Sequence, residues 1–202
     1  MIRLLTWEKI EMTLNSVVFI LFFAIVFILY FTIFRKHQRE LLLIASAVFL
    51  LSYQVQSLIL LLSVSLLVWI CALACERYKK GRKLIVVACN LLLLGILFVY
   101  KYLNFSINVL SFLKVKLFHT GSVISEPVFH LLLPVGISFW IFQNIAYLVD
   151  VYKSKIPAEK SLGRYLLFIG YFPKLSVGPI ERGENLLPQI PGGGIASLMI
   201  GL

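Results

Sequence analysis

A series of residues on one predicted helix has the spacing of a functional face. Its members are spaced three or four positions apart in LPVGISFWIFQNIAYLVDVY (133–152): Gly136, Trp140, Gln143, Tyr147 and Asp150. This spacing places the series on one side of an α-helix. Polar side chains at membrane depth usually face the bundle interior or a watery cavity. Two interpretations stay open: Gln143 and Asn144 hydrogen-bond a neighbouring helix with Asp150 merely at the interface, or the face lines a cavity.

The second candidate region is YFPKLSVGPIERGENLLPQI (171–190), which mixes charges with apolar and helix-breaking residues. A short helix is predicted to begin near Ser161, a residue type that favours the N-cap. Pro173 and then Gly178-Pro179 are expected to stop its regular continuation. Non-helical backbone at membrane depth is tolerated only when it is buried in protein or lines a cavity. The segment therefore predicts a cavity wall or funnel.

Two charged residues in that segment, Glu181 and Arg182, are further candidates. They form either a structural ion pair or, in the functional interpretation, a site where Arg182 anchors an anionic group. Together with Gly178 and Pro179 they make up the predicted mouth of the funnel.

We predict no catalytic group, metal site or cofactor in this chain. No nucleophile–base pair, metal-binding cluster or phosphate-binding loop occurs in the sequence. The cysteines lie inside apolar blocks without zinc-site spacing, and we interpret them as small apolar helix residues: Cys71, Cys75 and Cys89. The histidines lie in loops or at the ends of apolar runs and are expected to be ordinary interface residues: His37, His119 and His130.

The composition indicates the elements that must position these residues. Of 202 residues, 60% are hydrophobic and 14% charged, and the mean hydropathy is +0.96. Soluble domains carry about 25% charged residues, so we predict a polytopic membrane protein. The net charge of +10 does not indicate nucleic-acid binding, because the basic residues lie between apolar spans.

Five spans are predicted, each requiring roughly 20 apolar residues. The first is Leu14–Phe34; Leu41–Cys75 is too long for one crossing and is divided by a hairpin at Tyr53–Ser57. The fourth is Leu84–Tyr100, and the fifth begins near Leu131 or Pro134 and ends at Asp150.

The expected fold is an all-α bundle that forms a single transmembrane domain covering residues 1–202. Residues 101–127 are predicted to contain a helix along the membrane interface. Pro134 is interpreted as a first-turn proline of the fifth span, where its missing N–H costs little.

The basic residues predict the orientation of the spans. Twelve Lys and Arg residues fall in loops on one side and five on the other. Short loops rich in Lys and Arg stay cytoplasmic. We therefore expect the N-terminus to lie outside.

Two linked motifs resemble the membrane-bound O-acyltransferase family, within it the branch of the alginate O-acetyltransferases and teichoic acid D-alanyl transferases. That branch shows L-P-x-G-I-S-F-x-x-F-Q, Y-x-x-D-x-Y and F-P-x-L-x-x-G-P-I-x-R. Every fixed position is matched: Leu133, Pro134, Gly136, Ile137, Ser138, Phe139, Phe142, Gln143, Tyr147, Asp150, Tyr152, Phe172, Pro173, Leu175, Gly178, Pro179, Ile180 and Arg182. The similarity extends over nearly the whole chain, and the GPIER segment leans toward the polysaccharide O-acetyltransferases.

The resemblance implies an enzyme of a bacterial cytoplasmic (inner) membrane that passes an acyl group, expected to be acetyl, through a tunnel. The donor, a thioester or carrier-bound group, comes from the cytoplasmic side, and the acceptor is a hydroxyl of an envelope polysaccharide, with envelope-modification proteins as expected partners. Family members are about twice as long, and their catalytic histidine lies in the second half. The resemblance therefore implies an N-terminal portion that is inactive alone. Gln143, Tyr147, Asp150, Gly178, Pro179, Glu181 and Arg182 would then form the tunnel wall and donor funnel.

Two other classes stay open from the residues alone. One is a non-catalytic membrane scaffold, and the other is half of a transporter, since broken helices and polar midplane residues also suit transport. A downstream reading frame with a histidine in an apolar helix would favour the enzyme.

Overall fold

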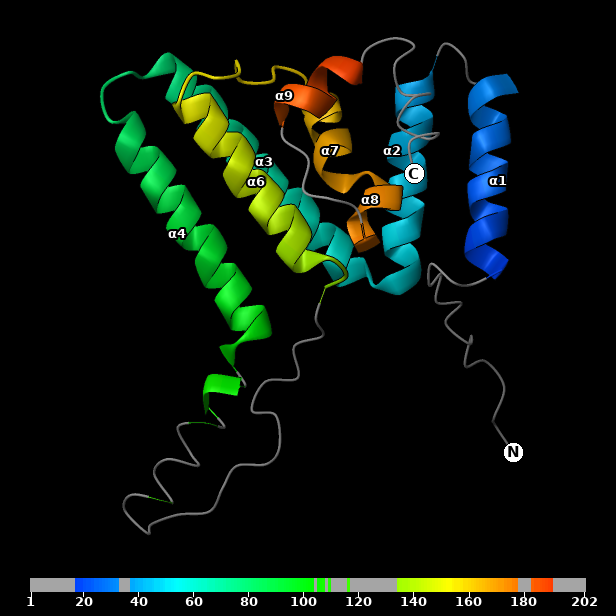
Figure 1. Cartoon of the computed structure of the whole chain (residues 1–202), viewed down its shortest axis with the longest axis horizontal. Coiled ribbons are helices and arrows are strands. Elements are labelled where there is room, and N and C mark those ends of the chain that lie inside the picture. The colour runs from blue at the N-terminus through cyan, green and yellow to red at the C-terminus, as the bar shows by residue number, and fades with distance from the viewer. Residues whose placement is uncertain are drawn as a thin grey trace.

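A computed structural model describes residues 17–32, 37–103, 105–107, 109, 116, 134–177 and 183–190. Every regular element in these ranges is a helix, as the all-α prediction requires. The helices are α1 (Val17–Thr32), α2 (Gln38–Tyr53), α3 (Val55–Arg77), α4 (Arg82–Lys101), α6 (Ile137–Tyr152), α7 (Leu162–Gly170), α8 (Phe172–Val177) and α9 (Gly183–Leu186), the last followed by a 3₁₀ turn, Leu187–Gln189. The longer helices run side by side, and α7 and α8 lie between α2 and the α3–α6 pair (Figure 1).

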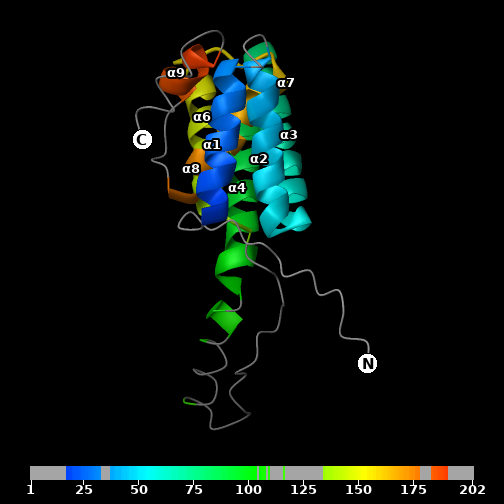
Figure 2. The same cartoon turned by 90° about the vertical axis from the view of Figure 1, so that its right-hand side faces the viewer.

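Helix α3 is the centre of the bundle. It contacts α2, α4, α6 and α7, whereas α1 lies at the edge and contacts α2. Seen from the side, the helices overlap in one narrow slab (Figure 2). The slab gives α6 and α7 a sheltered position, since α6 contacts α3, α4 and α7.

The predicted hairpin in Leu41–Cys75 is confirmed. Helix α2 ends at Tyr53, Gln54 is extended with φ −161° and ψ 131°, and α3 begins at Val55. The N–H of Gln54 still bonds the Leu50 carbonyl at 3.1 Å, so the reversal takes a single non-helical residue. Helix α3 is longer than expected, because it continues to Arg77.

The prediction for Pro134 is wrong. Helix α6 begins at Ile137, and Pro134 lies before it in a turn whose carbonyl accepts a hydrogen bond from the Ile137 N–H at 3.2 Å. Gly136 is the N-cap with φ +65°, a left-handed conformation that glycine adopts without steric cost. The proline thus shapes the turn, and the glycine starts the helix two residues later.

The break in the next helix also differs from the prediction. Helix α7 begins after Ser161, whose Oγ accepts a hydrogen bond from the Arg164 N–H at 3.5 Å, as expected for an N-cap. It ends at Gly170, before Pro173, and a new helix, α8, begins at Phe172. Pro173 is therefore in the first turn of α8, where its missing N–H and fixed φ are compatible with a helix.

The start of α8 is held against α1 and α2. The Phe172 N–H donates to Ser46 Oγ of α2 at 3.2 Å, so the backbone freed by the break has a buried partner. The Phe172 ring is fully buried, with centroids 5.3–6.4 Å from those of Phe19, Phe22, Phe23 and Phe49. This satisfies the requirement that irregular backbone at membrane depth be enclosed by protein.

The outer faces of the bundle are apolar. In the described part of the chain, α3 and α4 are long and apolar enough to cross a membrane, and α1 is a shorter apolar helix. Large side chains of α1 and α4 lie exposed, among them Ile20, Leu21, Leu84 and Leu91. An exposed apolar surface of this extent marks contact with a membrane or another protein.

A helix of 16 residues, such as α2 or α6, is about 24 Å long.

Several predictions lie outside the described residues. Gly178, Pro179, Glu181 and Arg182 are among them, as are His119, His130 and most of the predicted interfacial helix.

Candidate functional site

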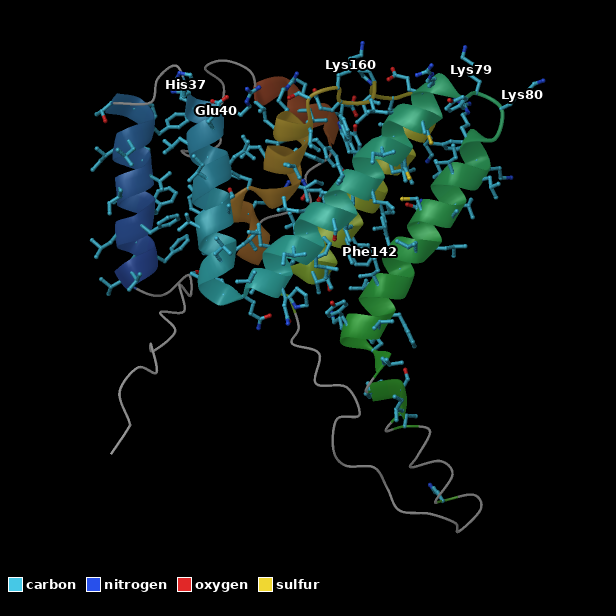
Figure 3. All side chains as sticks on the ribbon, turned by 180° about the vertical axis from the view of Figure 1, so that it is seen from behind. His37, Glu40, Lys79, Lys80, Phe142 and Lys160 are labelled. Carbon is cyan, nitrogen blue, oxygen red and sulfur yellow. The ribbon has the colours of Figure 1, made fainter. Side chains whose placement is uncertain are left out.

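The predicted face of α6 points into the bundle. Trp140, Gln143, Tyr147 and Asp150 are all buried, while Phe142 on the opposite side is exposed. Figure 3 shows Phe142 away from the end of the bundle where His37, Lys79, Lys80 and Lys160 lie. The three- and four-residue spacing therefore identified the buried side of this helix.

Gln143 joins α6 to the end of α7. Its Nε2 donates to the Phe168 carbonyl at 2.8 Å. Phe168 is in the last turn of α7, where carbonyl groups have no partner within the helix. The glutamine side chain thus satisfies the Phe168 carbonyl, which has no partner within α7 because the helix ends before α8.

Asn144 makes a second link between the same helices. Its Nδ2 donates to the Trp140 carbonyl at 2.7 Å, and its Oδ1 accepts from the Tyr165 hydroxyl at 2.5 Å. Both groups are buried. Hydrogen bonding between helices, one of the two interpretations of this face, is therefore present for Gln143 and Asn144.

Tyr147 connects the bundle interior to the loop that follows α6. Its ring lies 4.7 Å from that of Tyr165, between centroids, and its hydroxyl accepts from the Glu159 N–H at 2.8 Å. The Glu159 carbonyl accepts from Trp69 Nε1 of α3 at 2.7 Å. Glu159 is consequently fixed on both sides of its backbone, by α6 and by α3.

Asp150 is buried with an incomplete set of partners. Its Oδ1 lies 3.9 Å from Lys155 Nζ, which is beyond hydrogen-bond distance. Its Oδ2 is buried and has no hydrogen-bond partner among the described residues. A buried carboxylate oxygen is normally satisfied, so Asp150 retains the capacity to accept a further donor.

An ion pair at the same end of the bundle joins the α6–α7 loop to α7. Arg164 Nη1 lies 3.3 Å from Glu159 Oε2, and Arg164 Nη2 donates to the Leu187 carbonyl at 3.0 Å. Glu159 Oε1 also accepts from the Ser161 N–H at 2.9 Å. Arg164 therefore ties the loop to the 3₁₀ turn after α9.

These residues border a pocket of about 440 Å³ between the loop 156–160, the first turn of α7 and the α9 region. Gly183 lines it and lies against α6: a Cβ at this position would be 3.0 Å from Ile156 Cδ1 and 3.3 Å from Tyr147 Cδ2. Glycine thus allows close approach of the segment that directly follows the predicted funnel residues.

Glu159 and Arg164 were not predicted as site residues. The sequence places Glu159 two positions before the N-cap and Arg164 in the first turn of the helix, which is ordinary for charged residues. They lie five positions apart, across the end of the loop and the first turn of α7, a spacing that helix periodicity does not pair. Across the described ranges, no three metal-binding side chains lie together.

Comparison with known proteins gives homologues that share most of this chain. The chain is 33% identical to a protein named "Probable alginate O-acetylase AlgI" of Pseudomonas putida, over 88% of this chain and 37% of the relative. The protein of the same name in Pseudomonas aeruginosa is 33% identical over 88% of this chain and 34% of its own length.

A third relative is named peptidoglycan O-acetyltransferase. It comes from Helicobacter pylori and is 29% identical over 56% of this chain and 24% of its own length. The chain spans about a third of the length of the O-acetylases it matches, so these relatives exceed the twofold length that the resemblance implied. No family model and no solved structure matches the chain.

Proposed function

We propose that this chain is the N-terminal portion of a membrane-bound O-acyltransferase, an enzyme that transfers acetyl groups to hydroxyls of a cell-envelope polysaccharide. The observation that carries the proposal is the 32–34% identity, over 88% of the chain, to relatives named alginate O-acetylase. The peptidoglycan O-acetyltransferase supports the same acceptor class, a hydroxyl on an envelope polymer.

In this proposal the chain supplies the wall of the acyl tunnel and its donor-side mouth. The catalytic histidine, expected in the second half of the complete enzyme, would act as general base on the acceptor hydroxyl. Gln143 and Tyr147 hold α6, α7 and the following loop in place through their hydrogen bonds. Asp150, with one oxygen open among the described residues, is the α6 residue proposed to face the tunnel.

The mouth itself is proposed to include Gly178, Pro179, Glu181 and Arg182. Gly183, the next residue, lines the pocket beside Tyr147, which supports a position near the end of α6. A thioester or carrier-bound acyl donor would approach at this end from the cytoplasm, and envelope-modification proteins would assist on the acceptor side.

We also propose a five-span topology in a bacterial inner membrane with the N-terminus outside. The grouping of His37, Lys79, Lys80 and Lys160 at one end of the bundle supports it (Figure 3), because basic short loops stay cytoplasmic. Reporter fusions after Arg39, Arg82 and Lys155 should report cytoplasm, and one after Lys116 should report the exterior. A cytoplasmic signal after Lys116 would contradict the topology.

The test of the activity is a chimera. Joining these residues to the remaining C-terminal part of the Pseudomonas putida relative should give acetyl transfer to a polysaccharide hydroxyl, whereas the 202-residue chain alone should give none. A chimera that folds but transfers nothing, in an assay where the intact relative is active, would contradict the proposal. Transfer by the chain alone, persisting after replacement of His37, His119 and His130, would contradict the absence of a catalytic centre.

A further inference from the structure

The pocket between the α6–α7 loop and the α9 region has the size and composition of a ligand site. Its volume of about 440 Å³ falls within the range of roughly 300–1,000 Å³ typical of small-molecule sites. Ile156, Ala158 and Leu187 form buried apolar parts of its wall. Most of its lining is thus apolar, and a few charged side chains would determine what it binds.

Arg164 is the charged group with unused binding capacity. A guanidinium has five N–H donors, and the contacts to Glu159 and Leu187 are made through its two terminal nitrogens. Its Nε is buried and has no hydrogen-bond partner within the described part of the chain. The planar donor set of arginine fits the oxygens of a phosphate, which can take two parallel bonds.

The two partners of the Arg164–Glu159 pair differ in freedom. Glu159 is fixed through its backbone by Tyr147 and Trp69 and through Oε1 by the Ser161 N–H. The Arg164 side chain is 26% exposed against 10% for Glu159. Arg164, although bonded to the Leu187 carbonyl, is therefore the more accessible partner, and its contact with Glu159 is the one that a ligand can replace.

Among the described residues, the other charges at the pocket are Lys160 and Glu184, both exposed. Lys160 lies at the same end of the bundle as Lys79 and Lys80 (Figure 3). Because Lys160 is exposed and lines the pocket, its ammonium is available as a second cation at the rim. Glu184 opposes an anion, but its exposure to water weakens this repulsion.

We propose that this pocket binds a phosphate group, with Arg164 as its anchor and Lys160 as a second contact, and that the phosphate displaces Glu159 from Arg164. The binding claim stands on the pocket alone. Only the assignment of that phosphate to a phosphorylated acyl donor rests on the proposed function. Two sources carry this chemistry, a water-soluble phosphorylated molecule and the headgroup of an anionic phospholipid.

The test measures binding of inorganic pyrophosphate to the chain in phosphatidylcholine nanodiscs by calorimetry. Arg164→Gln should weaken binding by about tenfold or more, since it removes a charge-assisted pair. Lys160→Gln should weaken it by about threefold, as suits an exposed charge. Lys80→Gln, a cation at the same end that does not line the pocket, is the matched control and should leave the affinity unchanged.

Glu159→Gln gives the sharpest result, because Glu159 competes with the phosphate for Arg164. The proposal expects this variant to bind pyrophosphate about threefold more tightly or better, with its fold verified by thermal unfolding. Weaker or unchanged binding in folded Glu159→Gln would overturn the displacement. This variant also keeps the proposal testable if Arg164→Gln does not fold.

Nanodiscs containing phosphatidylglycerol distinguish the two sources. If the lipid headgroup occupies the site, pyrophosphate binding should be lost in them, and Glu159→Gln should not restore it. If a soluble molecule is the ligand, the affinity should fall only modestly. Equal affinities for wild type, Arg164→Gln and Lys80→Gln would overturn the site itself. Since no transfer is measured, that result would leave the chimera test of the proposed function intact.

Discussion

Buried polar side chains lie in two regions, the interior between α6 and α7 and the pocket at the end of these helices. The two regions differ in whether these side chains have hydrogen-bond partners. Inside, Gln143, Asn144 and Tyr165 hydrogen-bond one another's helices. At the pocket end, Asp150 Oδ2 and Arg164 Nε are buried without a partner in the described part of the chain.

The difference separates a structural role from a binding role. Buried polar groups are normally satisfied, so a fully bonded network mainly fixes the position of its helices. A buried donor or acceptor left open needs a partner from elsewhere, such as a ligand or another segment. We therefore expect substitutions in the interior to change stability, and those at the pocket end to change binding or transfer more than stability.

The largest stability effect is expected at the residue that joins the two regions. Tyr147→Ala removes a fully buried ring, which should lower the free energy of unfolding by about 3–5 kcal/mol. Tyr147→Phe keeps the ring and loses only the bond to the Glu159 N–H, for about 1 kcal/mol. Thermal unfolding in detergent measures both. Equal losses in the two variants would show that the hydroxyl, and not the packing, dominates.

A smaller effect is expected inside the satisfied network. Gln143→Leu keeps a similar volume but leaves the Phe168 carbonyl without its donor, a cost of about 1–3 kcal/mol for a buried group. Phe142→Leu, on the exposed side of the same helix, is the control and should change stability by about 0.5 kcal/mol or less. If both variants unfold at the same temperature, the Gln143 bond has no structural role.

Gly183→Ala tests the close approach of the α9 region to α6. The added methyl would lie 3.0 Å from Ile156 Cδ1, so neighbouring side chains must shift. We expect a loss of about 1 kcal/mol, at the lower limit of overpacking, and weaker pyrophosphate binding because the pocket wall moves. Gly95→Ala, where an added Cβ would have no contact within 4 Å apart from its own stretch of helix, is the control. Unchanged pyrophosphate affinity in Gly183→Ala would indicate that neighbouring side chains accommodate the methyl group without displacing the pocket wall.

The smallest stability effect is expected at Asp150. Its pair with Lys155 spans 3.9 Å and involves an exposed lysine, so Asp150→Asn should change stability by about 1 kcal/mol or less. In the chimera, however, the same substitution should reduce acetyl transfer if Asp150 faces the tunnel, whereas Lys155→Gln should not. A large loss of stability without a specific loss of transfer would show that Asp150 has a structural role, like the hydrogen-bonded residues of the interior.

Much of the helical arrangement was predictable from the sequence. Apolar runs set the helices because each needs a continuous apolar surface, and the polar interruption at Gln54 set the reversal between α2 and α3. The spacing of Trp140, Gln143, Tyr147 and Asp150 gave the buried side of α6, since periodicity along one helix is a local property. The N-cap at Ser161 was predictable for the same reason.

The tertiary structure decided where helices begin and end around prolines and which polar groups meet. Pro134 suits a helix's first turn and a preceding turn equally well, and the conformation of Gly136 selected the latter. Phe172 could start α8 after a break because Ser46, 126 positions earlier, satisfies its N–H. The bond from Arg164 to the Leu187 carbonyl likewise joins segments 23 positions apart. Local sequence determines helix faces and caps, but contacts between distant segments depend on packing that no periodicity records.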